Sequence, residues 1–248
     1  MKSPLIPISI ISIYKNSLGD RLPLPSRMAQ CTPDTYKAII NIATDVAKKG
    51  GKLVLSDLFR SYDMQSQSHK DYVSKKKKAF SPPPGGSFHE AGRAFDMDLG
   101  TIKMDLAAFW KLAAKYGVFP IIKLPKANVS EAWHFDRRGS HHLVYQYYSD
   151  KKGTNFAAYT AAAASGILSI GVHVDAFGDN QEQAALQSCL IRLGKTIGNI
   201  DGQIGRKTQL ALEELGIPFN RDKISDMLLQ AENLVQRAFP EEYTTPSM

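Results

Sequence analysis

The chain has 248 residues, 43% of them hydrophobic and 22% charged, which is the composition of a folded protein with room for one large domain or two smaller ones. Its formal net charge of +7 indicates a polyanionic surrounding, and nucleic acid, anionic lipid and anionic wall polymer all satisfy that description. Cys31 and Cys189 lie far apart and form no CxxC pair, which argues against a disulfide framework and against a cysteine zinc site.

Residues 1–29 are expected to form an N-terminal arm. Pro4 and Pro7 interrupt a short apolar run, and no small-x-small cleavage site follows it. We therefore expect no cleaved signal peptide at this end of the chain.

Residues 149–179 are expected to be an alanine-rich linker or packing segment. Phe156 to Val172 carry no charge, and this length approaches that of a membrane span. The segment is mostly Ala, Ser, Thr and Gly, however, and alanine contributes little insertion energy. We therefore predict a packed helix or an inter-domain segment and no stable insertion into a membrane.

Residues 30–148 mix helical and strand patterns. Thr32 followed by Pro33 is typical of a helix N-cap and first helical position, and a second helix is expected from Asp105 to Gly117. Strands are predicted at 53–55, 94–99, 118–122 and 133–135. Because these elements follow no repeating βα rhythm, the predicted fold class is α+β, with a small antiparallel sheet and flanking helices.

A long polar loop separates two of these strands. It contains the run Lys75 to Lys78, followed by Pro82 to Gly86. We interpret the lysines as a solvated loop, and only secondarily as a contact for an anionic polymer.

The predicted strand 94–99 alternates between apolar and polar residues. Hydrophobic side chains fall on one face, whereas Ala94, Asp96 and Asp98 fall on the other. Two carboxylates on one face of a strand indicate that this face lines a polar site. Asp98 is either a partner that orients a metal ligand or an ordinary residue at the end of a strand.

Two short segments contain the residues typical of a catalytic zinc site, 87–98 and 131–135. Such sites use three His or carboxylate ligands and leave a fourth position for water, and His89, Asp96 and His134 supply that set. Seven residues separate His89 from Asp96, which would place them on opposite faces of one strand. A turn between them is required, and Gly92 is the residue best able to make it.

Glu131 lies three residues before His134, so the chain must bend or form one helical turn before Trp133. A carboxylate in this position could accept a proton from a zinc-activated water. Arg60 is the candidate cation for stabilising the oxyanion. Tyr62 and Gln65 follow it and are candidates for lining the substrate cleft, whereas Trp133 is expected in the core.

The pattern Ser-x-His-x-x-Gly-x-Ala-x-Asp, followed by Glu-x-Trp-His, resembles the D-alanyl-D-alanine carboxypeptidase family of zinc peptidases over roughly residues 30–148. That family includes the VanY and VanX types and the phage L-alanyl-D-glutamate peptidases. The resemblance implies a small α+β fold shared with lysostaphin-type peptidases and the hedgehog signalling domain. It implies one Zn²⁺ ion bound by His89, Asp96 and His134, with Glu131 as catalytic base.

The resemblance further implies that Arg60 contacts substrate and transition state and that Ser87 helps to hold the substrate. Phe59 stands where relatives carry Tyr, and Ala132 stands where many carry Pro or Trp. The second departure bears on the local pocket and specificity more than on the metal.

Residues 180–248 follow helical patterns, and we expect a small three-helix domain. The run Asp201-Gly-x-x-Gly205-x-x-Thr208 resembles the signature of a peptidoglycan-binding domain of three helices. The second half of the usual pattern, an aromatic-Gln segment, is missing.

Together these features predict a monomeric zinc peptidase that cuts peptidoglycan stem peptides as a carboxypeptidase or an endopeptidase. It would act at the bacterial cell wall, in the periplasm or outside the cell, after lysis or specialised export, as an endolysin, a secreted effector or a wall-remodelling enzyme. No motif supports a nucleic-acid partner. The alternative is a non-catalytic zinc-containing wall-binding protein. Glu131 and Arg60 argue against it, because neither is needed to hold a metal.

Overall fold

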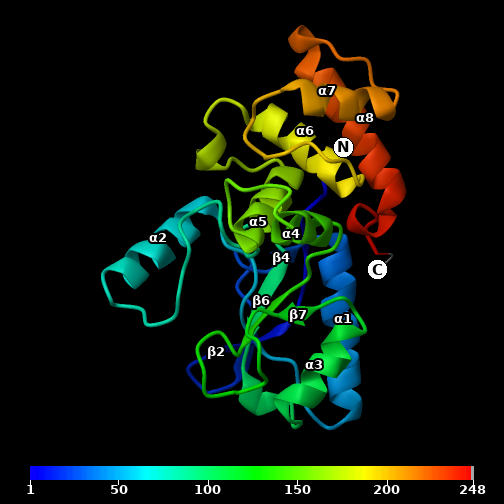
Figure 1. Cartoon of the computed structure of the whole chain (residues 1–248). Coiled ribbons are helices and arrows are strands. Elements are labelled where there is room, and N and C mark those ends of the chain that lie inside the picture. The colour runs from blue at the N-terminus through cyan, green and yellow to red at the C-terminus, as the bar shows by residue number, and fades with distance from the viewer. Residues whose placement is uncertain (247–248) are drawn as a thin grey trace.

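The computed structural model describes residues 1–246 and has an α+β fold (Figure 1). Its main sheet has six strands in the order β3-β2-β5-β6-β8-β7, and β1 and β4 form a separate pair. The strands are β1 (Ile6–Pro7), β2 (Ile11–Lys15), β3 (Arg21–Pro23), β4 (Gln30–Cys31), β5 (Leu55–Asp57), β6 (Ala94–Met97), β7 (Phe119–Pro120) and β8 (His134–Asp136).

The prediction of an antiparallel sheet was wrong in one place, because the sheet is mixed. Strands β2 and β5 run parallel, with Ser12 opposite Leu55, and every other neighbouring pair is antiparallel. A parallel pair needs a long crossover, and here the intervening chain includes a helix of 16 residues. Residues 1–29, expected to be an arm, contribute β1, β2 and β3.

The first half of the chain contains α1 (Pro33–Lys48), α2 (Tyr62–Val73), the short 3₁₀ helix η1 (Leu99–Thr101) and α3 (Leu106–Ala114). Helices α1 and α3 lie on one side of the sheet, whereas α2 projects from the body of the molecule (Figure 1). The core between helices and sheet includes Ile39, Ile42, Leu55, Phe95, Phe109 and Phe135. Phe95 and Phe135 are cross-strand partners with ring centres 5.9 Å apart, so their strands turn the alternate residues toward the opposite face.

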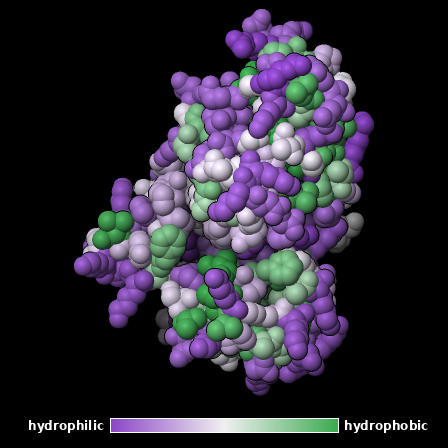
Figure 2. Space-filling view, in the orientation of Figure 1, coloured by the Kyte–Doolittle hydropathy of each residue, from purple (hydrophilic) through white to green (hydrophobic). Residues whose placement is uncertain are grey.

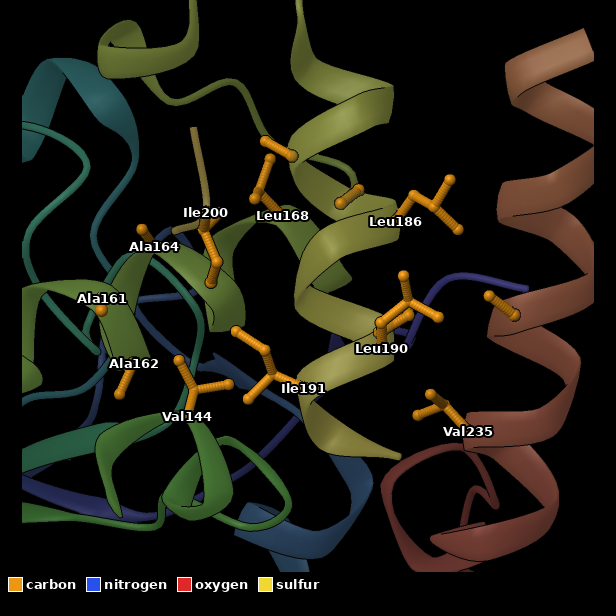
Figure 3. Packing of buried hydrophobic residues seen from close by; sticks show 14 of the residues in the cluster. Val144, Ala161, Ala162, Ala164, Leu168, Leu186, Leu190, Ile191, Ile200 and Val235 are labelled. Atoms are coloured by element: carbon orange, nitrogen blue, oxygen red, sulfur yellow. The ribbon is translucent and has the colours of Figure 1, made fainter. Parts of the chain in front are cut away.

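The second half is helical, and its hydrophobic core includes residues from the segment around His89. Its helices are α4 (His141–Ser149), α5 (Ala158–Ser169), η2 (Asp175–Phe177), α6 (Gln181–Arg192), α7 (Arg206–Glu214), η3 (Arg221–Lys223), α8 (Ile224–Ala238) and η4 (Pro240–Glu242). The alanine-rich segment forms α5, and its side chains meet α4 and α6 in a core that reaches α8 (Figure 3). Phe88 and Ala91 belong to the same core. Within residues 1–246, no helix is both long enough and apolar enough to cross a membrane.

A buried ion network also joins the two halves of the chain. Arg93 is fully buried and lies 2.8 Å from Asp34 of α1 and 3.1 Å from Glu242 of η4. The same Glu242 carboxylate lies 2.8 Å from Arg192 of α6. Because Arg93 immediately precedes β6, this network fixes the start of the strand that carries Asp96.

Candidate metal centre

Three potential ligand atoms lie close together beside the paired strands β6 and β8. Asp96 and His134 are direct cross-strand partners, and Asp96 Oδ1 lies 2.8 Å from His134 Nδ1. His89 Nε2 lies 3.2 Å from His134 Nδ1 and 3.3 Å from Asp96 Oδ1. His89 and His134 are almost completely buried, and Asp96 is 9% exposed. The structure therefore brings together the three residues that the sequence motif predicted as ligands.

The outer hydrogen bonds of the two imidazoles decide which ring nitrogens are free. His89 Nδ1 lies 2.7 Å from the carbonyl oxygen of Leu58, which can only accept, so Nδ1 carries the proton and Nε2 has a free lone pair. His134 Nε2 lies 2.9 Å from Asp136 Oδ1, so Nδ1 is the free nitrogen of that ring. Two lone pairs and a carboxylate oxygen thus face one point.

Such a set of acceptors requires a cation. Ligands that lie about 2.0 to 2.1 Å from a zinc ion at tetrahedral angles are separated by about 3.3 Å, which is close to the distances found here. Burial alone would lower the pKa of His134, but its hydrogen bonds with Asp136 and Asp96 raise it to about 10. The residues present therefore fit a zinc ion.

Two turns give the ligands their directions. Gly92 has a φ of +63° and its amide donates to the carbonyl of His89, so the chain reverses between His89 and β6 as the spacing required. A Cβ at Gly92 would lie 2.6 Å from the end of the Leu5 side chain and 3.1 Å from Cys31 Cα, so another residue here would displace these neighbours in addition to the strain of the positive φ. The expected bend before Trp133 is also present, because the amide of His134 donates to the carbonyl of Glu131 at 3.1 Å.

The three ligands lie in the wall of a cavity of about 520 Å³. Glu131, Arg60 and Ser87 line the same cavity. In the orientation of Figure 1 the surface is hollowed near its middle, and apolar side chains gather just below the hollow (Figure 2). An ion bound by the three residues would therefore be reached by a ligand of peptide size.

Residues 28–140 match the family model described as VanY, D-alanyl-D-alanine carboxypeptidase. This part of the chain belongs to the VanY family. The family and the ligand set together make the protein a zinc peptidase of the VanY carboxypeptidase family. The matched residues, called the VanY domain below, contain every ligand and end just before α4.

Several solved structures are similar to part of this chain. The LdcB LD-carboxypeptidase has 20% sequence identity, with 54% of this chain and 68% of that chain covered and a TM-score of 0.41. VanYB in complex with D-alanine-D-alanine has 15% identity, coverage of 55% and 82%, and a TM-score of 0.37. DacB from Streptococcus pneumoniae D39 has 22% identity, coverage of 50% and 78%, and a TM-score of 0.33. No curated protein matches the chain in sequence.

The two residues predicted to do chemistry in the VanY domain both line the cavity. Burial raises the pKa of Glu131, and the charge of Asp96 adds to this effect while His134 opposes it. The guanidinium of Arg60 is nine-tenths buried and donates to Asp57 at 2.5 Å and to Gln65 at 3.2 Å. A third contact places Arg60 Nη2 3.4 Å from Asp96 Oδ2, so this cation lies beside the ligand set.

Neither Tyr62 nor Gln65 is among the residues that line the cavity. Gln65 is fully buried, accepts from Arg60 and donates to Ser81 and to the carbonyl of Pro82. Its position is therefore behind Arg60, which it orients. Tyr62 is 41% exposed and donates to Asp175 at 2.8 Å, a contact that ties α2 to η2.

Three further expectations concern residues beside the motifs. Ser87 lines the cavity, and its hydroxyl accepts from the amide of His89 at 3.3 Å. Trp133, expected in the core, is half-buried and contributes to the cavity wall instead. Asp98 ion-pairs with Arg21 at 3.1 Å and caps η1, so it is a residue at the end of a strand and does not contact a ligand.

The interpretation of the sequence missed four residues near the ligands. Asp136, two residues after His134, orients that ligand, and its place on the same face of β8 could have been inferred from strand alternation. Arg138, Tyr145 and Tyr159 line the cavity. Two of these lie beyond the VanY domain, on α4 and α5, and only tertiary packing brings them to the site.

Proposed function

We propose that the protein hydrolyses peptide bonds in bacterial peptidoglycan stem peptides, as an endolysin or a wall-remodelling enzyme. The observation that carries this proposal is the convergence of three acceptor atoms on one point in a cavity that also presents Glu131 and Arg60. A carboxylate and a cation that hold no metal themselves are what a hydrolase needs and what a structural zinc site does not. This distinguishes catalysis from the alternative of a wall-binding protein.

Each residue has a separate task in this reaction. A bound zinc ion supplies Lewis acidity, which lowers the pKa of water toward about 7 and polarises a carbonyl. Glu131 accepts a proton from the attacking water at a carboxylate oxygen and returns it to the amine nitrogen that leaves as the C–N bond breaks. Arg60 donates to the oxygen of the scissile carbonyl as negative charge develops there, and Asp57 and Gln65 hold it in place before the substrate arrives.

We further propose that residues 180–248 hold the enzyme on the polymer. The Asp201-Gly202 turn is built by Gln187, whose side chain accepts from both amides, so this part of the signature is explained by folding. A groove of about 310 Å³ between the end of α6 and α7 includes Lys195 and Lys207 and is a candidate contact surface. Lys207→Glu should weaken cosedimentation of an inactive protein with insoluble peptidoglycan. Lys223→Glu, outside the groove, should not.

Digestion of purified peptidoglycan tests the catalytic proposal and identifies the bond that is cut. The wild-type protein with one equivalent of zinc should create new termini that mass spectrometry can assign. Release of a single amino acid indicates a carboxypeptidase, and new amino termini on the polymer indicate an endopeptidase. Glu131→Gln should still bind zinc, and it should hydrolyse the peptide at least about 10²-fold more slowly than wild type. Full activity of the zinc-loaded Glu131→Gln protein would remove Glu131 from this role, and no new termini from zinc-loaded wild type would reject the proposal.

A further inference from the structure

Arg138 is a nearly buried cation in the cavity wall with hydrogen-bonding capacity to spare. Its exposed fraction is 9%. Its Nε and Nη2 lie 3.4 and 3.3 Å from the same oxygen, Asp136 Oδ2. Among residues 1–246, no acceptor lies within hydrogen-bonding distance of its Nη1, and the side chain lines the cavity. One edge of the guanidinium is therefore available to a ligand.

Two tyrosine rings lie against this guanidinium. Its central carbon lies 4.2 Å from the ring centre of Tyr145 on α4 and 5.8 Å from that of Tyr159 on α5. The hydroxyl of Tyr159 donates to Asp136 Oδ1 at 3.3 Å, which holds the second ring in place. Aromatic faces orient a cation without neutralising its charge. Arg138 is thus packed against two aromatic rings and still presents its positive charge to the cavity.

The ion pair with Asp136 neutralises the positive charge of Arg138 only in part. Charge-assisted hydrogen bonds are usually 2.7 to 2.9 Å long, and both contacts from Arg138 are longer. Asp136 makes its short contact, 2.9 Å, with His134 Nε2. The carboxylate therefore serves mainly the metal ligand and leaves Arg138 incompletely paired.

The other cations of the cavity are more fully engaged. Arg60 donates to three acceptors, Asp57, Gln65 and Asp96, and Lys77 donates to the hydroxyl of Ser68 at 2.9 Å. Of the positive side chains that line the cavity, Arg138 is the one with a planar fork and a free donor edge. A planar carboxylate matches that fork in shape and charge.

We propose that Arg138 is a specificity-determining residue that binds a carboxylate of the substrate. The proposal rests on the proposed peptidase function. Stem peptides offer carboxylates of two sources, the terminal carboxyl group and the free carboxyl group of an acidic residue within the stem. Both present the same chemistry to Arg138, and the experiment below distinguishes them.

Four synthetic stem peptides test this inference: one with both carboxylates free, one amidated at the C-terminus, one amidated at the internal acidic residue, and one amidated at both. With the free peptide, Arg138→Gln should raise KM about tenfold, while kcat and zinc content stay close to wild type. Amidation of the recognised carboxylate should raise the wild-type KM by a similar factor and leave Arg138→Gln unaffected. The peptide that removes the difference between the two proteins identifies the source.

The same kinetic measurements distinguish substrate binding by Arg138 from an indirect role in which Arg138 only positions Asp136. If Arg138 only positioned Asp136 and His134, Arg138→Gln would lower kcat or zinc content by the same factor on all four peptides, which would overturn the proposal. Arg138→Lys should recover part of the lost affinity because it keeps the charge. Arg137→Gln is the matched control, since Arg137 is adjacent, is absent from the cavity lining and lies 3.5 Å from Asp34.

Calorimetric binding separates this inference from the proposed catalysis. Glu131→Gln protein should bind the free peptide about tenfold more tightly than the fully amidated peptide, and the double variant with Arg138→Gln should bind the two equally. This outcome supports the carboxylate site even if wild type cuts none of the four peptides. Equal binding of both peptides by the Glu131→Gln protein would overturn it.

Discussion

His134 and Asp136 lie two residues apart on β8 and point to the same face of the sheet, with Nε2 of the ring 2.9 Å from the carboxylate. This hydrogen bond fixes the tautomer that leaves Nδ1 free for a metal ion. Partners of metal-bound histidines of this kind commonly contribute 10- to 100-fold to metal affinity.

Asp136→Asn should therefore weaken zinc binding about 10- to 100-fold, because the amide can present its nitrogen to the ring and favour the wrong tautomer. Competition with a chromogenic chelator measures the affinity. Asp98→Asn is the matched control, since Asp98 follows the ligand Asp96 by the same two residues but ion-pairs with Arg21. Equal zinc affinities of Asp136→Asn and wild type would contradict the role assigned to Asp136.

The stability of the metal-free protein should depend on the charge of His134. In the metal-free protein the pKa of His134 is raised to about 10, because its hydrogen bonds with Asp136 and Asp96 outweigh the opposing effect of burial. A folded-state pKa above the unfolded value of about 6.5 stabilises the protein fully below pH 6.5, and this contribution is lost as pH rises toward 10.

Chelator-treated protein should accordingly lose unfolding free energy between about pH 6.5 and 10, and zinc-loaded protein should lose much less over that range. Calorimetric or urea unfolding at several pH values measures the difference. Asp136→Asn should flatten the slope of the metal-free protein. A metal-free protein that gained stability between pH 6.5 and 10 would contradict this account.

Arg60→Lys should lower kcat by about 10²-fold and leave zinc content unchanged. Lysine keeps the positive charge, but it lacks the fork that contacts Asp57, Gln65 and Asp96 together. Steady-state kinetics with a stem peptide, together with metal analysis, measures both quantities. Gln65→Leu removes one of the three contacts and should have a smaller effect on kcat; a larger effect would place Gln65 in the reaction itself.

Glu242→Gln should destabilise the protein by about 3 to 5 kcal/mol, because it leaves Arg93 and Arg192 buried with a charge that is no longer compensated. Urea unfolding of the zinc-loaded protein measures the change. Glu241→Gln is the control. Glu241 forms no ion pair within residues 1–246, so its substitution should change stability little. Equal losses from the two variants would contradict the role of the buried network.

The ligand set could be predicted from sequence because local chemistry determines it. His89, Asp96 and His134 are ligand types, and their spacings require turns that Gly92 and the carbonyl of Glu131 provide. The α+β class followed from short-range patterns in the same way. Each of the two motifs is recognised from residues that are close in the chain, although folding has to bring His134 to Asp96 across 38 residues.

The rest of the site depends on contacts between distant segments. Tyr159 reaches Asp136 across 23 residues, and no periodicity within α5 indicates that one of its side chains lines a cavity. The parallel pairing of β2 with β5 likewise arises because residues before α1 enter the sheet, which the strand pattern of 30–148 could not show. Gln65 was misplaced for the opposite reason, since closeness to Arg60 in the chain suggested a shared cleft where the structure shows a supporting bond.

The ion pair between Arg93 and Glu242 joins residues that leave the ribosome at widely separated times. A ribosome-bound chain in which both histidines and Asp96 have already emerged still lacks the carboxylate that neutralises Arg93, and Phe88 and Ala91 have not yet met the complete helical core that covers them. The buried network at the start of β6 would therefore be complete only after translation has passed residue 242. A fragment ending soon after α4, whether from a nonsense codon or a protease nick, would contain every ligand but would leave Arg93 without the carboxylate of Glu242.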